Sequence, residues 1–477
     1  MNDLNLTLLV DFYELSMAYG FYDNGKAEQR AVFDIFYRKA PDEASFAIFV
    51  GLEQMIDYLL NLKFNPDDLK YLESLNCFST EFIEYLRNFK FKADVYAFKE
   101  GTIIYPNEPI VTVVGTLIEC QLVETMLLLI FNHSSLIATK AKRITLSAQN
   151  RVVSDFGARR AHNVSSAIYG ARAAYIGGVS STSNVLASKM FNIPTSGTMA
   201  HSWVMAFDSE EEAFLAYCKT YPNDAVLLID TYDTLKSGII NAIKVNNEYL
   251  VKHNSYLKGV RIDSGDLAYL SKEVRKILDE NNLEKTKIIV SNALDEFKIN
   301  SLLQQGAKID AFGVGENLIT SKSNPVFGGV YKLVAIEENN KFIPRIKISN
   351  TLEKITNPGF KDVYRIYKDG KAIADLLTLK DEEIDLSKPY KVYDSNKLYK
   401  ENIYLEDCQI KKLQHLIFKD GKLVYHCPKL EEIRNYVDEQ INNEMWEEEK
   451  RLYYPHQHYL DFSQKLKNIK ESLIKNE

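Results

Sequence analysis

The pattern of apolar and polar positions changes twice along the chain. Up to about residue 150, helical segments alternate with β-rich runs such as ADVYAFKEGTIIYPNEPIVTVVGTL. DFYELSMAYGFYDNG predicts a helix that ends at Asn24-Gly25, and QLVETMLLLIFNHSSLIATKAKRITLSAQN predicts a long buried helix. From 151 to 335, short apolar runs alternate with amphipathic segments, and from 336 to 477 that rhythm stops. We therefore predict three domains: an N-terminal α/β domain over 1–150, a central domain over 151–335 and a C-terminal α+β extension over 336–477.

The central rhythm predicts a parallel sheet. Strands are expected at VVSDFG, YIGGVSST, IPTSGTM, AVLLIDTY, KGVRID, KIIVSN and IDAFGVG, separated by helices such as SEEEAFLAYCKTY and LDEFKINSLLQQG. Strands separated by helices form right-handed βαβ units, in which the strands are parallel. About seven such units favour an α/β fold with an irregular TIM-like barrel, and a doubly wound open sheet is the alternative.

The last third of the chain predicts hairpins followed by helices. KDVYRIYKDGKAIADLLTL and HLIFKDGKLVYH read as paired strands that turn at Asp369-Gly370 and Asp420-Gly421. Residues 430–453 and 461–476 predict amphipathic helices, whose charged runs are expected to be solvated faces. His456 and His458 have no further potential metal ligands nearby in the sequence, and we expect both to be surface residues.

Composition narrows the classes of protein that remain. The 477 residues are 46% hydrophobic and 26% charged, as in globular proteins with large cores. The net charge of −7 and the lack of a basic tract argue against nucleic acid as a partner. The five cysteines are scattered without a CxxC pair, and neither a signal peptide nor an apolar run of membrane-spanning length is seen. The expectation is a cytoplasmic enzyme that does not bind membranes.

Polar residues follow every predicted central strand. In an α/β barrel the carboxyl ends of the strands gather at one rim, where active sites form. Arginines there can hold phosphate or carboxylate, and aspartates can hold Mg²⁺ with substrate oxygens or stabilise a developing sugar cation. For Ser264 and Asp266, capping of a helix N-terminus remains an equal alternative. The rim residues are Asp155, Gly157, Arg159, Arg160, Ser181, Thr182, Ser183, Asn184, Ser196, Gly197, Thr198, His201, Asp230, Thr231, Asp233, Arg261, Asp263, Ser264, Asp266, Ser291, Asn292, Gly313, Gly315 and Glu316.

Two of these strand ends carry more specific chemistry. GVGENLITSKS offers backbone N–H groups at a helix start, which suits a phosphate monoester, although it lacks the third glycine of a dinucleotide-binding loop. His201 follows the glycine-containing turn of SGTMAHSWVMAF. Its place on the predicted rim favours a functional histidine, either a proton shuttle or a nucleophile toward a phosphoryl group.

Several of these motifs together resemble the nicotinate phosphoribosyltransferase family. They are DFGARRAH, SGTMAHSWVMAF, VRIDSGDL, VSNALDEFKI and DAFGVGENLITSKSNPVFGGVYKLV, joined by the N-terminal LLVDFYELSMAYGFY and EGTIIYPNEPIVTVVG. The resemblance implies synthesis of nicotinate mononucleotide and pyrophosphate from nicotinate and phosphoribosyl pyrophosphate, in NAD salvage. It also implies Mg²⁺, coupling to ATP hydrolysis through a phosphohistidine, and a homodimer with shared active sites.

The resemblance also implies roles for individual residues. His201 would be the phosphorylated histidine and would act with Asp230 and Asp263, which are also the candidate Mg²⁺ ligands. The pyridine ring would lie between Phe156 and Tyr13, the latter from the other subunit. The implied nicotinate-binding residues are Tyr13, Phe156, Thr198 and Arg261, and those for the phosphoribosyl group are Arg159, Ser183, Gly313, Gly315, Glu316 and Thr320.

One departure and three alternatives stay open. Glu316 and Asn317 stand where many relatives have Gly-Thr, and a carboxylate beside a phosphate is unfavourable unless it points away. The alternatives are a nicotinamide phosphoribosyltransferase, a TIM-barrel lyase or isomerase acting on a phosphosugar, and a non-catalytic scaffold whose C-terminal helices bind a partner. The lyase would need a strand-end lysine or an enolising acid/base pair; no predicted strand-end lysine stands out, and Lys332 lies beyond the barrel rhythm.

Overall fold

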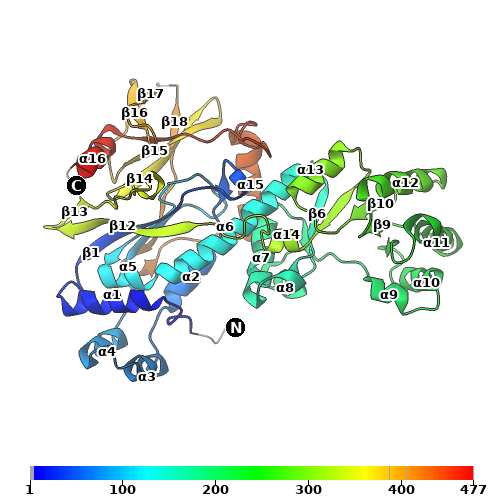
Figure 1. Cartoon of the computed structure of the whole chain (residues 1–477), viewed down its shortest axis with the longest axis horizontal. Helices are drawn as coiled ribbons and strands as arrows, with labels where there is room; N and C mark the ends of the chain where they lie inside the picture. The colour runs from blue at the N-terminus through cyan, green and yellow to red at the C-terminus, as the bar shows by residue number, and fades with distance from the viewer. Residues whose placement is uncertain (1–4, 386, 405–406, 476–477) are drawn as a thin grey trace. The chain divides into compact units, whose positions relative to one another are not determined.

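The chain folds into two compact units. The computed structural model describes residues 5–385, 387–404 and 407–475 (Figure 1). One unit is made of Met1–Leu136 and Val326–Glu477, and the other of Ile137–Pro325. Helix α6 (Glu124–Ser147) has residues in both units and is largely buried, which confirms the predicted long helix. The division into three domains stays a prediction.

The first unit is built on a seven-stranded antiparallel sheet that draws strands from both ends of the chain. Its order is β13-β12-β1-β5-β3-β19-β20. The central strand β1, with the sequence RAVFDIFY, is buried after its first residue and pairs with β5 and β12. The strands are β1 (Arg30–Tyr37), β3 (Asp94–Ala97), β5 (Val111–Thr116), β12 (Gly329–Glu338), β13 (Lys341–Pro344), β19 (His415–Lys419) and β20 (Lys422–Leu423).

Local signals fix the helices around this sheet. The side chains of Thr116 and Glu119 form a capping box that begins α5, and Ser79 accepts a hydrogen bond from the Phe82 N–H at the start of α4. Helix α1 ends at Asn24, followed by Gly25 with φ +67, as the sequence predicts. The helices are α1 (Phe12–Asp23), α2 (Leu52–Asn61), α3 (Pro66–Ser74), α4 (Thr80–Arg87) and α5 (Leu117–Leu122), with the short pair β2 (Ala47–Ile48) and β4 (Ile103–Ile104).

A second sheet of the same unit contains the first of the two predicted C-terminal hairpins, whereas the other, β19 and β20, belongs to the seven-stranded sheet. The order of the second sheet is β17-β16-β21-β15-β14-β18. Asp369 and Gly370 both have positive φ between β14 and β15, and Asp420 and Gly421 do so between β19 and β20, which confirms both predicted turns. The strands are β14 (Lys361–Lys368), β15 (Lys371–Leu379), β16 (Tyr390–Asp394), β17 (Glu401–Tyr404), β18 (Gln409–Lys412) and β21 (Leu460–Phe462).

The first C-terminal helix is shorter than the sequence predicts. Helix α15 (Leu430–Glu439) continues for one π turn to Glu444, and the chain is extended at Met445. The Met445 side chain is buried, and the Trp446 indole N–H donates to the Ala372 carbonyl of β15. These tertiary contacts end a helix that periodicity would have continued. The second helix, α16 (Gln464–Lys475), forms as predicted.

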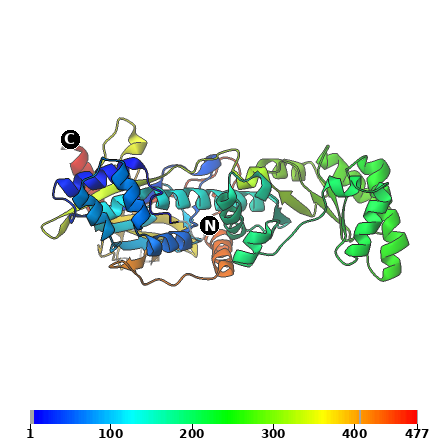
Figure 2. The same ribbon diagram turned by 90° about the horizontal axis from the view of Figure 1, so that it is seen from below.

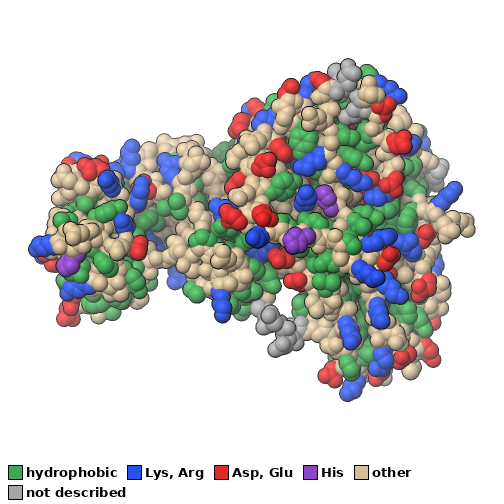
Figure 3. Space-filling view, turned by 180° about the vertical axis from the view of Figure 1, so that it is seen from behind, with side chains coloured by type: hydrophobic (Ala, Val, Ile, Leu, Met, Phe, Trp, Pro, Cys, Tyr) green, Lys and Arg blue, Asp and Glu red, His purple; other side chains and the backbone are tan. Residues whose placement is uncertain are grey.

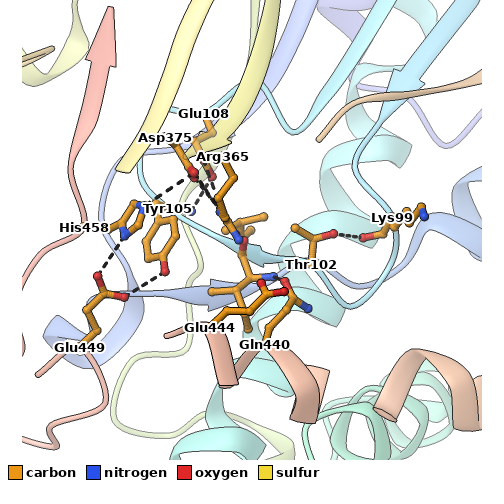
Figure 4. A network of polar contacts seen from close by, with 12 residues as sticks. Lys99, Thr102, Tyr105, Glu108, Arg365, Asp375, Gln440, Glu444, Glu449 and His458 are labelled. Carbon is orange, nitrogen blue, oxygen red and sulfur yellow. Dashed lines mark hydrogen bonds and ion pairs between the residues drawn. The ribbon is translucent and has the colours of Figure 1, made fainter. Parts of the chain in front are cut away.

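His458 contradicts the prediction that it lies on the surface. Its side chain is 1% exposed and stacks on Tyr105 with ring centroids 3.7 Å apart (Figure 4). Its Nδ1 lies 2.9 Å from Glu449, and its Nε2 lies 3.7 Å from Asp375. The carboxylates of Asp375 and Glu449 outweigh burial and raise the pKa of His458. The sequence suggested a surface residue because Tyr105 and Asp375 come from distant segments, and Glu449 alone does not indicate burial.

The same network contains a buried arginine held by a carboxylate. Arg365 donates two hydrogen bonds to Asp375, of 2.9 and 2.8 Å, and a third to the Ile103 carbonyl (Figure 4). Arg365 outweighs burial and holds the pKa of Asp375 below its usual range. Burial and the neighbouring Asp375 raise the pKa of Glu108 well above its usual range. Glu108 also lies 4.0 Å from Arg365, so the arginine has a second carboxyl group beside it.

The second unit is organised around a six-stranded parallel sheet flanked by helices (Figures 1 and 2). Its order is β7-β6-β11-β10-β9-β8, and every adjacent pair is parallel. The strands are β6 (Val152–Asp155), β7 (Ser181–Thr182), β8 (Val226–Leu228), β9 (Gly259–Ile262), β10 (Lys287–Val290) and β11 (Ala311–Val314). The helices are α7 (Val164–Ile176), α8 (Val185–Phe191), α9 (His201–Met205), α10 (Glu210–Thr220), α11 (Ile239–Val245), α12 (Leu267–Glu280), α13 (Glu296–Gln304) and α14 (Glu316–Ile319).

Two of the predicted central strands are much reduced. YIGGVSST begins as the end of α7, and only Ser181 and Thr182 are strand. IPTSGTM contributes a single parallel bridge, from Thr195 to Thr182. The parallel α/β sheet is thus confirmed, and strands β7 and β8 are its edges among residues 137–325, all of which are described. The short strands reflect glycine and proline positions, where a regular ladder is weakened.

The distribution of charge on the surface and the polarity of the helices agree with the mixed charged composition of the chain. On the face shown in Figure 3, lysine and arginine side chains are interspersed with aspartate and glutamate. Among the described residues, every helix is too short or too polar to cross a bilayer.

Candidate active site

The carboxyl ends of the parallel strands carry a connected set of polar side chains. Because the strands are parallel and in register, residues that follow β6, β9 and β10 reach the same edge of the sheet. The predicted rim residues of this unit therefore meet, and hydrogen bonds link several of them directly.

Arg261 is the centre of this set. It lies on β9, and its side chain is only 16% exposed. Its Nε donates to the Ser291 hydroxyl at 2.9 Å, and one terminal nitrogen donates to Asp263 at 3.2 Å. The other terminal nitrogen donates to the Thr198 hydroxyl at 3.2 Å and faces the Met199 carbonyl at 3.4 Å. These contacts hold the guanidinium at the strand ends, with its carbon 5.4 Å from the centroid of Phe156.

Two aspartates and His201 lie beside the guanidinium. Asp230, which is 9% exposed, accepts hydrogen bonds from the Asp263 N–H at 2.8 Å and the Ser264 hydroxyl at 2.6 Å. His201 begins α9, with Nδ1 3.1 Å from Thr231 Oγ1 and Nε2 3.8 Å from an Asp263 oxygen. The structure therefore brings the three predicted catalytic residues together. Asp266 instead caps α12, which is the structural role left open for it.

Phe156 is held against the end of β11 by a close backbone approach. A Cβ placed on Gly313 would lie 2.5 Å from the Phe156 ring, so glycine is required there. The preceding Asp155 is buried and accepts hydrogen bonds from the Gly157 N–H at 2.8 Å and the Thr182 hydroxyl at 2.7 Å. Burial raises the pKa of Asp155, while these two donors oppose the rise. The ring therefore packs directly against the backbone of β11 at Gly313.

The predicted phosphate loop follows β11. Gly315 precedes α14, and the Thr320 hydroxyl donates to the Glu316 carbonyl at 2.7 Å. Glu316 accepts a hydrogen bond from Lys322 at 2.7 Å and lies 4.0 Å from Arg160. These two cations, chiefly Lys322, lower the pKa of Glu316. The carboxylate is therefore neutralised locally, which removes part of the objection to a phosphate nearby.

The side chains of Arg159, Ser183 and Tyr13 have no described contact with the Arg261 set or with the loop after β11. Arg159 and Ser183 are exposed at the ends of β6 and β7. Tyr13 belongs to the other compact unit, where it lies on α1 with 46% of its surface exposed. Burial and the nearby Glu124 raise the pKa of Tyr13, so its hydroxyl is protonated at neutral pH.

The structure also identifies partners to which the sequence gave no role. Asp155, Thr231 and Ser291 were expected only at the rim, yet their side chains bond to the Gly157 N–H next to Phe156, to His201 and to Arg261, respectively. Their position directly after a strand was the available signal. The contact of the Met199 carbonyl with Arg261 could not be predicted from the sequence, because every residue has a backbone carbonyl.

The potential metal ligands at these strand ends are the carboxylate oxygens of Asp230 and Asp263. Within the described residues, no group of three or more His, Cys, Asp or Glu side chains is placed to hold an ion. Asp230 has one buried oxygen, Oδ1, without a hydrogen-bond partner. This donor set fits Mg²⁺, which commonly uses one or two protein carboxylates together with substrate phosphates.

Models of one protein family match most of the chain. The nicotinate phosphoribosyltransferase N-terminal domain matches residues 8–132, the family model matches 152–365, and the C-terminal domain matches 360–470. Nicotinate phosphoribosyltransferase of Bacillus subtilis is 45% identical over 464 residues, covering 97% of this chain and 94% of that protein. The human enzyme of that name is 30% identical and is covered to 96%.

Solved structures show the same fold. The crystal structure of human nicotinic acid phosphoribosyltransferase has a TM-score of 0.85 at 28% identity, covering 97% of this chain and 99% of that one. A nicotinate-nucleotide pyrophosphorylase from Pyrococcus furiosus has a TM-score of 0.70 at 24% identity, and this likeness concerns the fold alone.

Proposed function

Since this chain belongs to the nicotinate phosphoribosyltransferase family, we propose that it joins nicotinate to phosphoribosyl pyrophosphate, releasing nicotinate mononucleotide and pyrophosphate. The observation that supports this most directly is the set formed by Arg261, Phe156, Asp263 and His201 at one sheet edge. In this set the Arg261 guanidinium can bind the carboxylate of nicotinate, the Phe156 ring can stack on the pyridine, and the Asp263 carboxylate can face the ribose. The product would enter NAD salvage.

Nicotinate would bind with its ring on Phe156 and its carboxylate toward Arg261. Thr198, which already accepts a hydrogen bond from Arg261, would lie beside that carboxylate. A guanidinium gains a charge-assisted pair with an acid but not with an amide, which favours nicotinate over nicotinamide. Tyr13 would cover the second face of the ring from the other subunit of a homodimer. Its exposure on α1, next to exposed Phe12 and Met17, suits that role.

The phosphoribosyl group would lie between the aspartates and the loop after β11. We assign Arg159, Ser183, Gly313, Gly315, Glu316 and Thr320 to the phosphate side, with Glu316 neutralised by Lys322. Asp230 and Asp263 would hold Mg²⁺, which neutralises charge on the leaving pyrophosphate when it is bound. As pyrophosphate leaves, positive charge develops at the anomeric carbon, and these carboxylates stabilise it while the pyridine nitrogen attacks from the opposite face.

His201 would couple the reaction to ATP. Its ring is part-exposed at the start of α9, with Nδ1 facing a hydroxyl and Nε2 facing the Asp263 carboxylate. An imidazole nitrogen held in this way can accept a phosphoryl group. A phosphohistidine here would add negative charge beside the site of pyrophosphate and its metal ion.

Finer features of the fold are proposed with this function. We propose that the parallel sheet and the Thr195 segment beside β7 form an irregular TIM-like barrel. The three domains, 1–150, 151–335 and 336–477, belong to the same proposal, as do cytoplasmic location and the homodimer.

The test is turnover of the purified chain with phosphoribosyl pyrophosphate and Mg²⁺, with and without ATP, while pyrophosphate is measured. We expect pyrophosphate release with nicotinate and little with nicotinamide. The reverse preference would favour a nicotinamide phosphoribosyltransferase. No release with either acceptor would reject the proposal and leave the lyase and scaffold alternatives. For the lyase, no residue directly following a strand of the described parallel sheet is lysine.

Arg261→Gln should reverse the preference for the acid. We expect kcat/KM for nicotinate to fall about 100-fold, because a hydrogen bond to a charged group is worth roughly 1.5–3 kcal/mol. The substitution also removes a hydrogen bond to Asp263, and displacement of Asp263 should slow the reaction with both acceptors equally. The measurement is therefore the ratio of kcat/KM for nicotinate to kcat/KM for nicotinamide. An unchanged ratio would remove Arg261 from acid recognition.

Gly313→Ala should displace the Phe156 ring, because the new Cβ would overlap it. We expect KM for nicotinate to rise about tenfold, as for the loss of one aromatic contact of roughly 1.4 kcal/mol. Gly20→Ala on α1 is the control, since its Cβ would meet open space. Equal KM values in both variants would contradict the ring-binding role of Phe156.

A further inference from the structure

Ser291 lies between Arg261 of β9 and Asp263, which directly follows that strand, and contacts both. It directly follows β10 and is 4% exposed. Its backbone N–H donates to the Ile262 carbonyl at 3.0 Å, which sets Ser291 beside the segment that carries Arg261 and Asp263. The neighbouring strand therefore delivers a hydroxyl between a guanidinium and a carboxylate.

The Ser291 hydroxyl accepts a hydrogen bond from one charged group and donates a hydrogen bond to the other. Ser291 Oγ accepts from Arg261 Nε at 2.9 Å and donates to Asp263 Oδ1. Arg261 also donates directly to the same oxygen at 3.2 Å. A serine hydroxyl is the smallest side chain that can accept and donate at once, so it completes a closed ring of three hydrogen bonds.

This ring distinguishes the two oxygens of Asp263. Oδ1 receives both described side-chain donors, whereas Oδ2 lies 3.8 Å from His201 Nε2. The hydrogen bonds to Ser291 and Asp263 use Nε and one terminal nitrogen of Arg261. They fix the plane of the guanidinium, whose central carbon lies 5.4 Å from the Phe156 ring centroid.

We propose that Ser291 is a positioning residue, which sets the angle of Arg261 toward the carboxylate of nicotinate and turns Oδ2 of Asp263 toward His201. This inference rests on the proposed function. Ser291 itself touches no reacting atom. Its effect passes through the orientation of two charged side chains, which also pair directly at 3.2 Å.

The test compares Ser291→Ala with Ser291→Thr, which keeps the hydroxyl. Ser291→Ala should raise KM for nicotinate about tenfold, the loss expected for one hydrogen bond to a charged group, and should lower the nicotinate-to-nicotinamide ratio of kcat/KM. Ser291→Thr should restore most of the ratio. Ser271→Ala is the matched control, because Ser271 is a buried serine of the same unit that bonds only to backbone.

A merely structural role predicts a different pattern. Loss of folded protein lowers the active fraction, so kcat falls while KM and the acceptor ratio stay constant. That pattern, or a Ser291→Ala variant equal to the wild type, would overturn the positioning role while the proposed function stands. Wild-type protein that fails to release pyrophosphate with nicotinate would instead reject the proposed function, and the role of Ser291 with it.

Discussion

His201→Ala is expected to abolish the stimulation of nicotinate mononucleotide synthesis by ATP while leaving slow, ATP-independent synthesis. The proposed phosphoryl acceptor is the imidazole, and alanine offers no nucleophilic atom in its place. Arg261, Phe156 and Asp230 are not covalently involved, so nicotinate and phosphoribosyl pyrophosphate can still meet. The residual rate should equal that of the wild-type protein without ATP.

Two measurements check this result. Pyrophosphate release is followed with and without ATP, and ATP hydrolysis is followed in parallel. His253→Ala is the control, because His253 is an exposed histidine of the same unit whose ring contacts only Tyr249 and its carbonyl in the described contacts. A His201→Ala protein with full ATP stimulation would reject the phosphohistidine, and loss of all synthesis would assign the imidazole to the transfer step instead.

Asp375→Ala is expected to lower the free energy of unfolding by about 3–5 kcal/mol, the usual cost of removing one partner of a buried ion pair. The substitution leaves the 2% exposed Arg365 side chain without its two strongest hydrogen bonds. It also removes one of the two carboxylates that face His458. Among the described carboxyl contacts, Arg365 would then keep only Glu108, 4.0 Å away, and His458 would keep only Glu449.

Denaturant unfolding of the purified chain measures this change. Glu401→Ala, which removes the exposed partner of Lys391, should leave the midpoint almost unchanged. A double variant, Arg365→Met with Asp375→Leu, should recover part of the stability, because apolar residues remove the unpaired charge. Equal midpoints for Asp375→Ala and Glu401→Ala would show that the network adds no stability.

The elements with strong local signals were predictable from sequence. Gly25 after α1, the Asp-Gly turns before β15 and β20, and the apolar runs of β6 and β9 to β11 all lie where the sequence placed them. Their conformations depend on neighbouring residues, through positive φ at glycine and through burial of a continuous apolar strand. The short β7, the bridge at Thr195 and the end of α15 were not predictable, because distant contacts decide them.

The site shows the same division. The sequence alone determined the kinds of group at the strand ends, since parallel strands bring their carboxyl ends to one edge, and so it identified His201, Arg261 and Asp263 as candidates. It could not determine which hydroxyl joins which charge. The Ser291 bridge to Arg261 and the packing of His458 against Asp375 and Tyr105 depend on side chains that are far apart in sequence, and only the tertiary structure brings them into contact.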